Sequence, residues 1–95
     1  MREYEVGFII HPKLEEEETN AVIEKVKGWI VDAGGEVTDA DIWGRRTLAY
    51  PIQHQREGFY VFLQTKMPPE AVETLENNLR ISESVLRHIV VRTDE

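Results

Sequence analysis

The spacing of apolar residues switches between two periods along this chain, and the order of the switches limits the possible folds more than any other feature. Apolar side chains occupy every second position from residue 4 to residue 10, which is the period of a half-buried strand. From residue 22 to residue 33 the spacing is helical, after an acidic first turn at residues 15–18. Gly34-Gly35 then provides a helix stop. A strand followed by a helix is therefore predicted.

Two further strands are predicted after this helix. A long strand is expected over residues 36–48, where the apolar residues change parity, and we place a bulge or bend at Gly44. A five-residue polar gap separates residue 52 from Gly58, and the next strand is expected from Phe59 to about Lys66. These two strands predict a twisted hairpin.

A short helix and a last strand complete the pattern. Val72, Leu75 and Leu79 share one helical face, and residues 85–92 have the composition of a strand. The order β-α-β-β-α-β is that of the ferredoxin-like α+β fold, and we expect one such domain over residues 1–95. In this fold two helices cover one face of a four-stranded antiparallel sheet, with the first and third strands in the centre. The other face, and the edge at the second strand, are then available for binding.

Positive charge is sparse but concentrated. The formal net charge of −7 argues against a protein that coats nucleic acid non-specifically. The arginines considered for binding are Arg2, Arg45, Arg46, Arg87 and Arg92. The first and last strands are expected to be antiparallel neighbours, so Arg2 and Arg92 should approach one end of the sheet, with Arg87 further along. Guanidinium groups can contact phosphate bidentately, which favours an RNA-backbone site. The alternative is ion pairing with Glu3 and Glu5.

The sequence supplies little for catalysis. The three histidines are isolated, and none has the spacing of a zinc site. There is no cysteine, and the serines have no nucleophile motif around them. We therefore predict a protein that is not an enzyme, with no cofactor and no metal. Carboxylates near the N-terminus and the absence of a membrane-length apolar run lead us to expect a cytoplasmic protein.

Five segments, in order along nearly the whole chain, carry a family pattern. They are residues 1–6, 45–52, 58–60 leading to Met67-Pro68, 79–81 and 85–91. Together they resemble the bacterial small-subunit ribosomal protein six family, and the Leu-Ala-Tyr-Pro-Ile run at 48–52 is the most specific match. The resemblance implies a structural constituent of the small ribosomal subunit. It implies binding to the central domain of small-subunit ribosomal RNA as a heterodimer with ribosomal protein eighteen.

The resemblance also implies roles for individual residues. By position, Arg2 and Arg87 are the first candidates for RNA contact, followed by Arg92 and His88.

A second set of candidates lies on or just beyond the edge of the second strand. The resemblance implies that Arg45, Arg46 and Tyr50 dock the basic partner protein or nearby RNA. Trp43 lies beside them but outside the motif, so it is expected either to pack against a partner or to cap the hairpin. For Arg45 and Arg46, simple protection of a sheet edge is the alternative.

Two other functions fit the same fold. An autonomous RNA-recognition motif that binds single-stranded RNA is one, because residues 56–62 are faintly similar to its strand-three signature, with Phe59 as the stacking residue to test. Tyr4 and Phe8 speak against it, since they fit an inward-facing row. A small enzyme of the acylphosphatase kind is the other, but Pro12 removes an amide donor from the loop that would cradle an anion.

Overall fold

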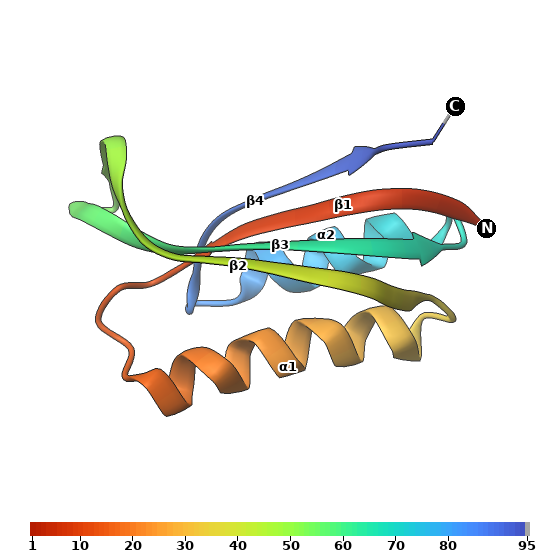
Figure 1. Cartoon of the computed structure of the whole chain (residues 1–95), viewed down its shortest axis with the longest axis horizontal. Coiled ribbons are helices and arrows are strands. Elements are labelled where there is room, and N and C mark those ends of the chain that lie inside the picture. The colour runs from red at the N-terminus through yellow and green to blue at the C-terminus, as the bar shows by residue number, and fades with distance from the viewer. Residues whose placement is uncertain (95) are drawn as a thin grey trace.

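Four strands form one antiparallel sheet with two helices on one of its faces (Figure 1). The computed structural model describes residues 1–94. The elements, in chain order, are β1 (Arg2–Ile10), α1 (Glu16–Asp32), β2 (Glu36–Ile52), β3 (Gln55–Met67), α2 (Ala71–Ile81) and β4 (Val85–Arg92). The strand order is β2-β3-β1-β4, which confirms the predicted ferredoxin-like fold with β1 and β3 in the centre. Within the described residues, no helix is both long enough and apolar enough to span a bilayer.

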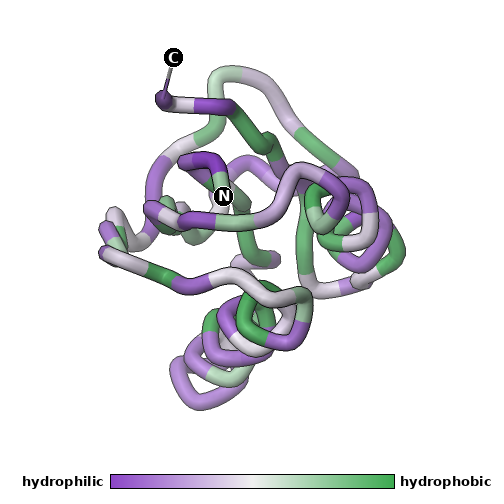
Figure 2. The backbone as a smooth tube through the Cα atoms, turned by 90° about the vertical axis from the view of Figure 1, so that its right-hand side faces the viewer, coloured by the Kyte–Doolittle hydropathy of each residue, from purple (hydrophilic) through white to green (hydrophobic). Residues whose placement is uncertain are grey.

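The core lies between the sheet and the helices. Alternate residues of β1 point into it, and their partners in register share the same face: Val6 pairs with Leu63 on β3 and with Val90 on β4. From the helices, Val26, Ile30 and other apolar side chains complete the core. Figure 2, which looks along the strands, shows both helices on the same side of the sheet. Within residues 1–94, no helix covers the opposite face (Figure 2).

Helix α1 ends as its glycines predict. Gly34 has a φ of 89°, and its N–H donates to the Val31 carbonyl at 3.0 Å. The Gly35 N–H donates to the Ile30 carbonyl at 2.9 Å, which completes a Schellman motif. Trp29 of α1 is partly buried and packs against the margin of the core, whereas Ile23 is buried within it.

The predicted bulge at Gly44 is confirmed. Ile42 pairs with Val61 and Gly44 pairs with Tyr60, so Trp43 is an extra residue with no partner on β3. Gly44 has a φ of 80°, a conformation that glycine adopts without strain. Trp43 alternates with Asp41, which lies opposite Phe62, so its side chain is on the uncovered face of the sheet.

The loop between β2 and β3 is shorter than the polar gap in the sequence predicts. Strand β2 continues to Ile52 and β3 already begins at Gln55, so only Gln53 and His54 form the turn. Both have positive φ, 48° and 66°, which is the pattern of a type I′ hairpin turn. The register shifts between Thr47 and Ile52, and the hairpin tip curls away from the helices (Figure 1).

Candidate RNA and protein interface

The uncovered face of the sheet, here called the bare face, is built from the strand positions that alternate with the core. The residues that β1, β3 and β4 contribute to it include Glu5, Gly7, Ile9, Tyr60, Phe62, Gln64, Arg87, Ile89 and Val91. Two of its aliphatic side chains, Ile89 and Val91, are 57% and 44% exposed. Exposed aliphatic side chains on an open sheet face are typical of a surface that binds a partner.

A shallow apolar groove crosses the centre of the bare face. A Cβ atom at Gly7 would lie 2.7 Å from Cε1 of Phe62, so the glycine leaves room for this ring to lie across β1. The groove has a volume of about 250 Å³ and is lined mainly by Gly7, Ile9, Tyr60, Phe62 and Ile89, with Arg87 at its margin. Its size suits one apolar side chain.

Trp43 extends the aromatic surface onto β2. Its ring centroid lies 4.6 Å from that of Phe62, with the rings tilted by 50°, and 6.2 Å from that of Tyr60, with the rings nearly parallel. The indole Nε1–H donates to Asp41 Oδ2 at 3.0 Å. Trp43 is still 46% exposed. It therefore packs on its own hairpin and also presents aromatic surface to solvent.

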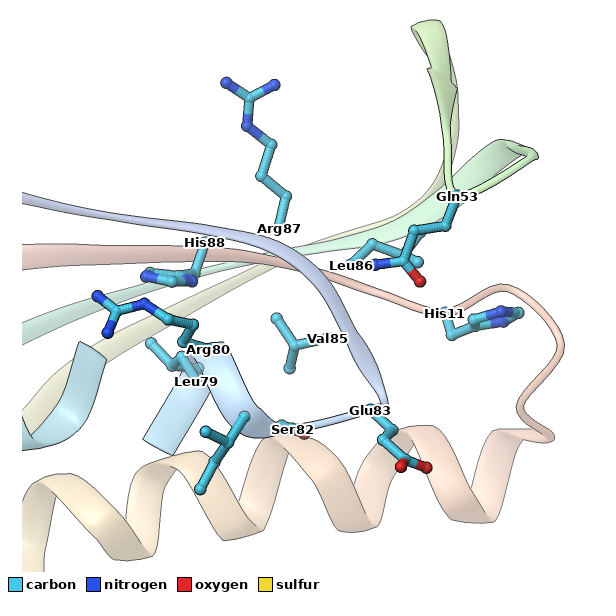
Figure 3. A pocket seen from close by; sticks show the side chains of 11 residues that line it. His11, Gln53, Leu79, Arg80, Ser82, Glu83, Val85, Leu86, Arg87 and His88 are labelled. Carbon is cyan, nitrogen blue, oxygen red and sulfur yellow. The ribbon is translucent and has the colours of Figure 1, made fainter. Parts of the chain in front are cut away.

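Arg87, a candidate for RNA contact, touches Tyr50, a candidate for partner docking. Its guanidinium donates a hydrogen bond to the Tyr50 hydroxyl and lies 6.0 Å from the centroid of the Tyr50 ring. Arg87 is on β4 and Tyr50 is near the hairpin tip, so the contact spans the bare face. Figure 3 shows Arg87 pointing away from the other labelled side chains of β4 and α2. A candidate for RNA contact and a candidate for partner docking thus touch each other.

His88 faces the helices instead. Its Nε2 lies 3.7 Å from Oε2 of Glu76 on α2, and its side chain is only 18% exposed. With Arg80 and His11 it lines an open hollow of about 690 Å³ between β4 and the end of α2 (Figure 3). It is on the opposite side of the sheet from Arg87.

The arginines of β1 and β4 have the predicted order along the strands, but they do not gather in one place. Arg92 lies opposite Tyr4, so Arg92 and Arg2 do approach the same end of the sheet. Arg87 lies opposite Ile9, seven residues from Arg2 along β1, or about 23 Å away. Because strand positions alternate, Arg87 also points to the other face. The three arginines are therefore not one cluster.

Arg92 has an acidic partner, but not the predicted one. Its Nε–H donates to Asp94 Oδ1 at 3.0 Å, whereas Glu3 and Glu5 form no ion pair with an arginine in residues 1–94. This hydrogen bond from Arg92 holds the pKa of the Asp94 carboxyl below its ordinary value of 3.8.

Arg45 and Arg46 point to opposite faces, as expected for successive strand residues. Arg45 lies opposite Phe59, and its guanidinium donates to the Pro12 carbonyl at 2.8 Å and lies 3.8 Å from a Glu57 oxygen. Arg46 lies opposite Gly58 on the bare face and donates to the Arg45 carbonyl at 3.1 Å. The structure thus brings Arg46, Tyr50 and Arg87 to the bare face and its hairpin end, and excludes Arg45.

Phe59 does not have the orientation that base stacking would need. It lies opposite Ile10 and packs against the core. The aromatic residues of β3 on the bare face are Tyr60 and Phe62, and β1 adds no aromatic residue beside them. The sequence contained the signal for this, because Tyr60 and Phe62 alternate with the buried Val61 and Leu63.

Comparison with known proteins identifies the family pattern across most of the chain. The model of the family described as ribosomal protein S6 matches residues 3–92. Small ribosomal subunit protein bS6 of Carboxydothermus hydrogenoformans is 48% identical over 95 residues, covering 100% of this chain and 99% of its own. The bS6 protein of Clostridium novyi is 47% identical over 95 residues, with both chains fully covered. The crystal structure of 30S ribosomal protein S6 from Thermotoga maritima superposes with a TM-score of 0.93 at 31% identity, covering 97% of this chain and 87% of that one.

Proposed function

Because the chain belongs to the ribosomal protein S6 family, we propose that it binds the central domain of small-subunit ribosomal RNA as a heterodimer with ribosomal protein eighteen. Membership of the family makes it a ribosomal protein of the small subunit, not an enzyme.

The contact between Arg87 and Tyr50 carries this proposal. It ties a cationic side chain of β4 to the hairpin at the border of an apolar, uncovered sheet face. A protein partner that covers the bare face would leave Arg87 at the border of the joint surface. There its guanidinium can bind an RNA phosphate.

Arg2 is proposed as a second RNA contact at the other end of β1. It is exposed and forms no ion pair within residues 1–94. The distance of about 23 Å from Arg87 means that the two arginines would contact separate segments of the RNA backbone. Arg92 and His88 remain candidates, but each must first leave a carboxylate partner.

A basic partner fits the charge of this chain. The net charge of −7 gives weak affinity for RNA to the protein alone, whereas it attracts a cationic protein. The bare face and hairpin, with Arg46, Tyr50 and Trp43, are proposed as the docking surface. Arg45, which is held against the Pro12 carbonyl, is proposed to support the hairpin.

Filter binding to a transcript of the RNA central domain tests the proposal. We expect weak binding by this chain alone and at least a tenfold gain in apparent affinity when ribosomal protein eighteen is added. Equal affinity with and without the partner would contradict the proposal.

The second candidate function, an autonomous binder of single-stranded RNA, is favoured only by Tyr60 and Phe62 on the bare face. Under it, short oligonucleotides would bind this chain alone, and Phe62→Ala would abolish that binding. We expect no such binding, because Glu5 and Gly7 of β1 do not extend the aromatic surface.

A further inference from the structure

We propose that Trp43, together with neighbouring carboxylates, is a receptor for an arginine side chain of a basic protein partner. The inference deepens the proposed function, on which it rests for the identity of the partner. The cation-binding aromatic surface itself is formed only by residues of this chain, on the bare face.

The backbone presents Trp43 for binding. Trp43, the unpaired residue of the β2 bulge, is on the bare face like Asp41 two residues before it, and its indole lies against Phe62 and Tyr60. These two rings support the indole from within the protein, so its orientation is fixed before a partner arrives. About half of the residue stays exposed. A rigid, exposed indole face is the best aromatic acceptor for a cation, and arginine is the cation that most often uses it.

The charges beside the indole select for a cation. Asp41 accepts the indole N–H at 3.0 Å, which places its carboxylate at the edge of the ring. Asp39 and Glu5 lie on the same face, because both share the register of Gln64. The four ion pairs within residues 1–94 do not involve any of these three carboxylates. A guanidinium stacked on Trp43 could therefore donate to Asp41 without displacing a cation.

The apolar groove adds the second feature of the partner. It lies over β1, two strand spacings from β2, which is about 10 Å. An extended segment covers that distance in about three residues. The structure thus points to a partner segment with an arginine on Trp43 and an apolar side chain, some three residues away, in the groove beside Ile89.

The first test uses small probes and needs no partner protein. The full chain is titrated with N-acetyl-arginine amide and, as the matched neutral control, with N-acetyl-citrulline amide. The indole N–H resonances are followed by NMR. We expect a saturable shift of the Trp43 resonance with the arginine probe only. Trp29, which lies on α1 away from the bare face, serves as the internal control. Equal shifts with both probes, or equal shifts of both tryptophans, would overturn the proposal.

The second test measures affinity for ribosomal protein eighteen by calorimetry. Trp43→Ala should weaken binding about tenfold, whereas Trp43→Phe, which keeps an aromatic face, should stay within about threefold of the wild type. Asp41→Asn should weaken binding about threefold. Thermal unfolding of each variant checks that the exposed substitutions leave the fold intact.

The outcomes separate this inference from the proposed function. If protein eighteen binds Trp43→Ala within twofold of the wild type, the receptor is refuted while the heterodimer stands. If the wild type does not bind protein eighteen but the arginine probe still shifts Trp43, the heterodimer is refuted and the receptor stands. If the chain self-associates and Trp43→Ala abolishes this self-association, the surface binds a second copy of the chain and the inference is overturned. If oligonucleotides quench the fluorescence of Trp43 while the arginine probe has no effect, the surface binds nucleic acid and the inference is likewise overturned.

Discussion

The neighbours of each arginine decide whether its charge is available to RNA. Arg45 and Arg92 are held by oxygen atoms of this chain, including carboxylates. The guanidinium of Arg87 donates to the neutral hydroxyl of Tyr50 and lies near its ring, and no carboxylate pairs with it in residues 1–94. Exchange of the tyrosine hydroxyl for a phosphate replaces a neutral acceptor with an anionic one, which strengthens the hydrogen bond from the guanidinium. Under the proposed function, Arg87 can therefore bind an RNA phosphate without first breaking an ion pair.

Arg87→Ala should weaken the RNA complex about tenfold or more, because it removes a hydrogen bond donor with a full charge. The midpoint of thermal unfolding should change by no more than about 2 °C, since the lost contacts are on the surface. Filter binding with protein eighteen present and a thermal melt measure the two effects. Tyr50→Phe, which keeps the ring, is the control for loss of the internal hydrogen bond. A large fall in stability with unchanged RNA affinity would show that Arg87 is a structural residue.

The face of the sheet on which a strand residue lies could be predicted from the sequence, but the contacts of its side chain could not. The opposite orientations of Arg45 and Arg46 follow from the period of two alone. The contact between Arg87 and Tyr50, 37 residues apart, depends on how far the hairpin curls. That curl lies at the register shift between Thr47 and Ile52, which leaves no periodic signal in the sequence.

Among the secondary-structure elements, the order and most boundaries could be predicted because burial sets the apolar period. The exception is the hairpin tip, where residues 53–57 are all polar and indicate a loop. Two of them, Gln53 and His54, form a type I′ turn without the glycine that usually marks it. Pairing with β2, not strand propensity, holds the start of β3 in the ladder.

Two glycines around α1 should respond to alanine in opposite directions. A Cβ at Gly28 would meet nothing within 4 Å, so Gly28→Ala should raise the free energy of unfolding by about 0.5–1 kcal/mol through helix propensity. A Cβ at Gly35 would lie 2.7 Å from the Lys66 carbonyl oxygen, which belongs to the backbone. Gly35→Ala should therefore lower the free energy of unfolding by about 2 kcal/mol. Urea denaturation measures both changes, and equal effects would contradict the close packing of α1 against the end of β3.

Under the proposed function, carboxylates at the bare face favour docking of a cationic protein there. Glu15–Glu18 and the acidic residues of α2 lie in the helical layer, whereas Asp39, Asp41 and Glu5 border the bare face. The net charge of −7 attracts a basic protein from any direction, but the carboxylates nearest the docking surface act at the shortest distance. Salt should therefore slow the encounter more than it speeds dissociation.

The association rate constant with ribosomal protein eighteen should fall about tenfold or more between about 20 and 500 mM salt, with little change in the dissociation rate constant. Stopped-flow fluorescence of Trp43, in a Trp29→Phe background, measures both. Asp39→Asn and Glu73→Gln each remove one negative charge, the first on the bare face and the second on α2. If the partner docks on the bare face, Asp39→Asn should slow association more than Glu73→Gln at low salt, and the difference should vanish at high salt. The reverse order would mean that the helical layer, not the bare face, meets the partner.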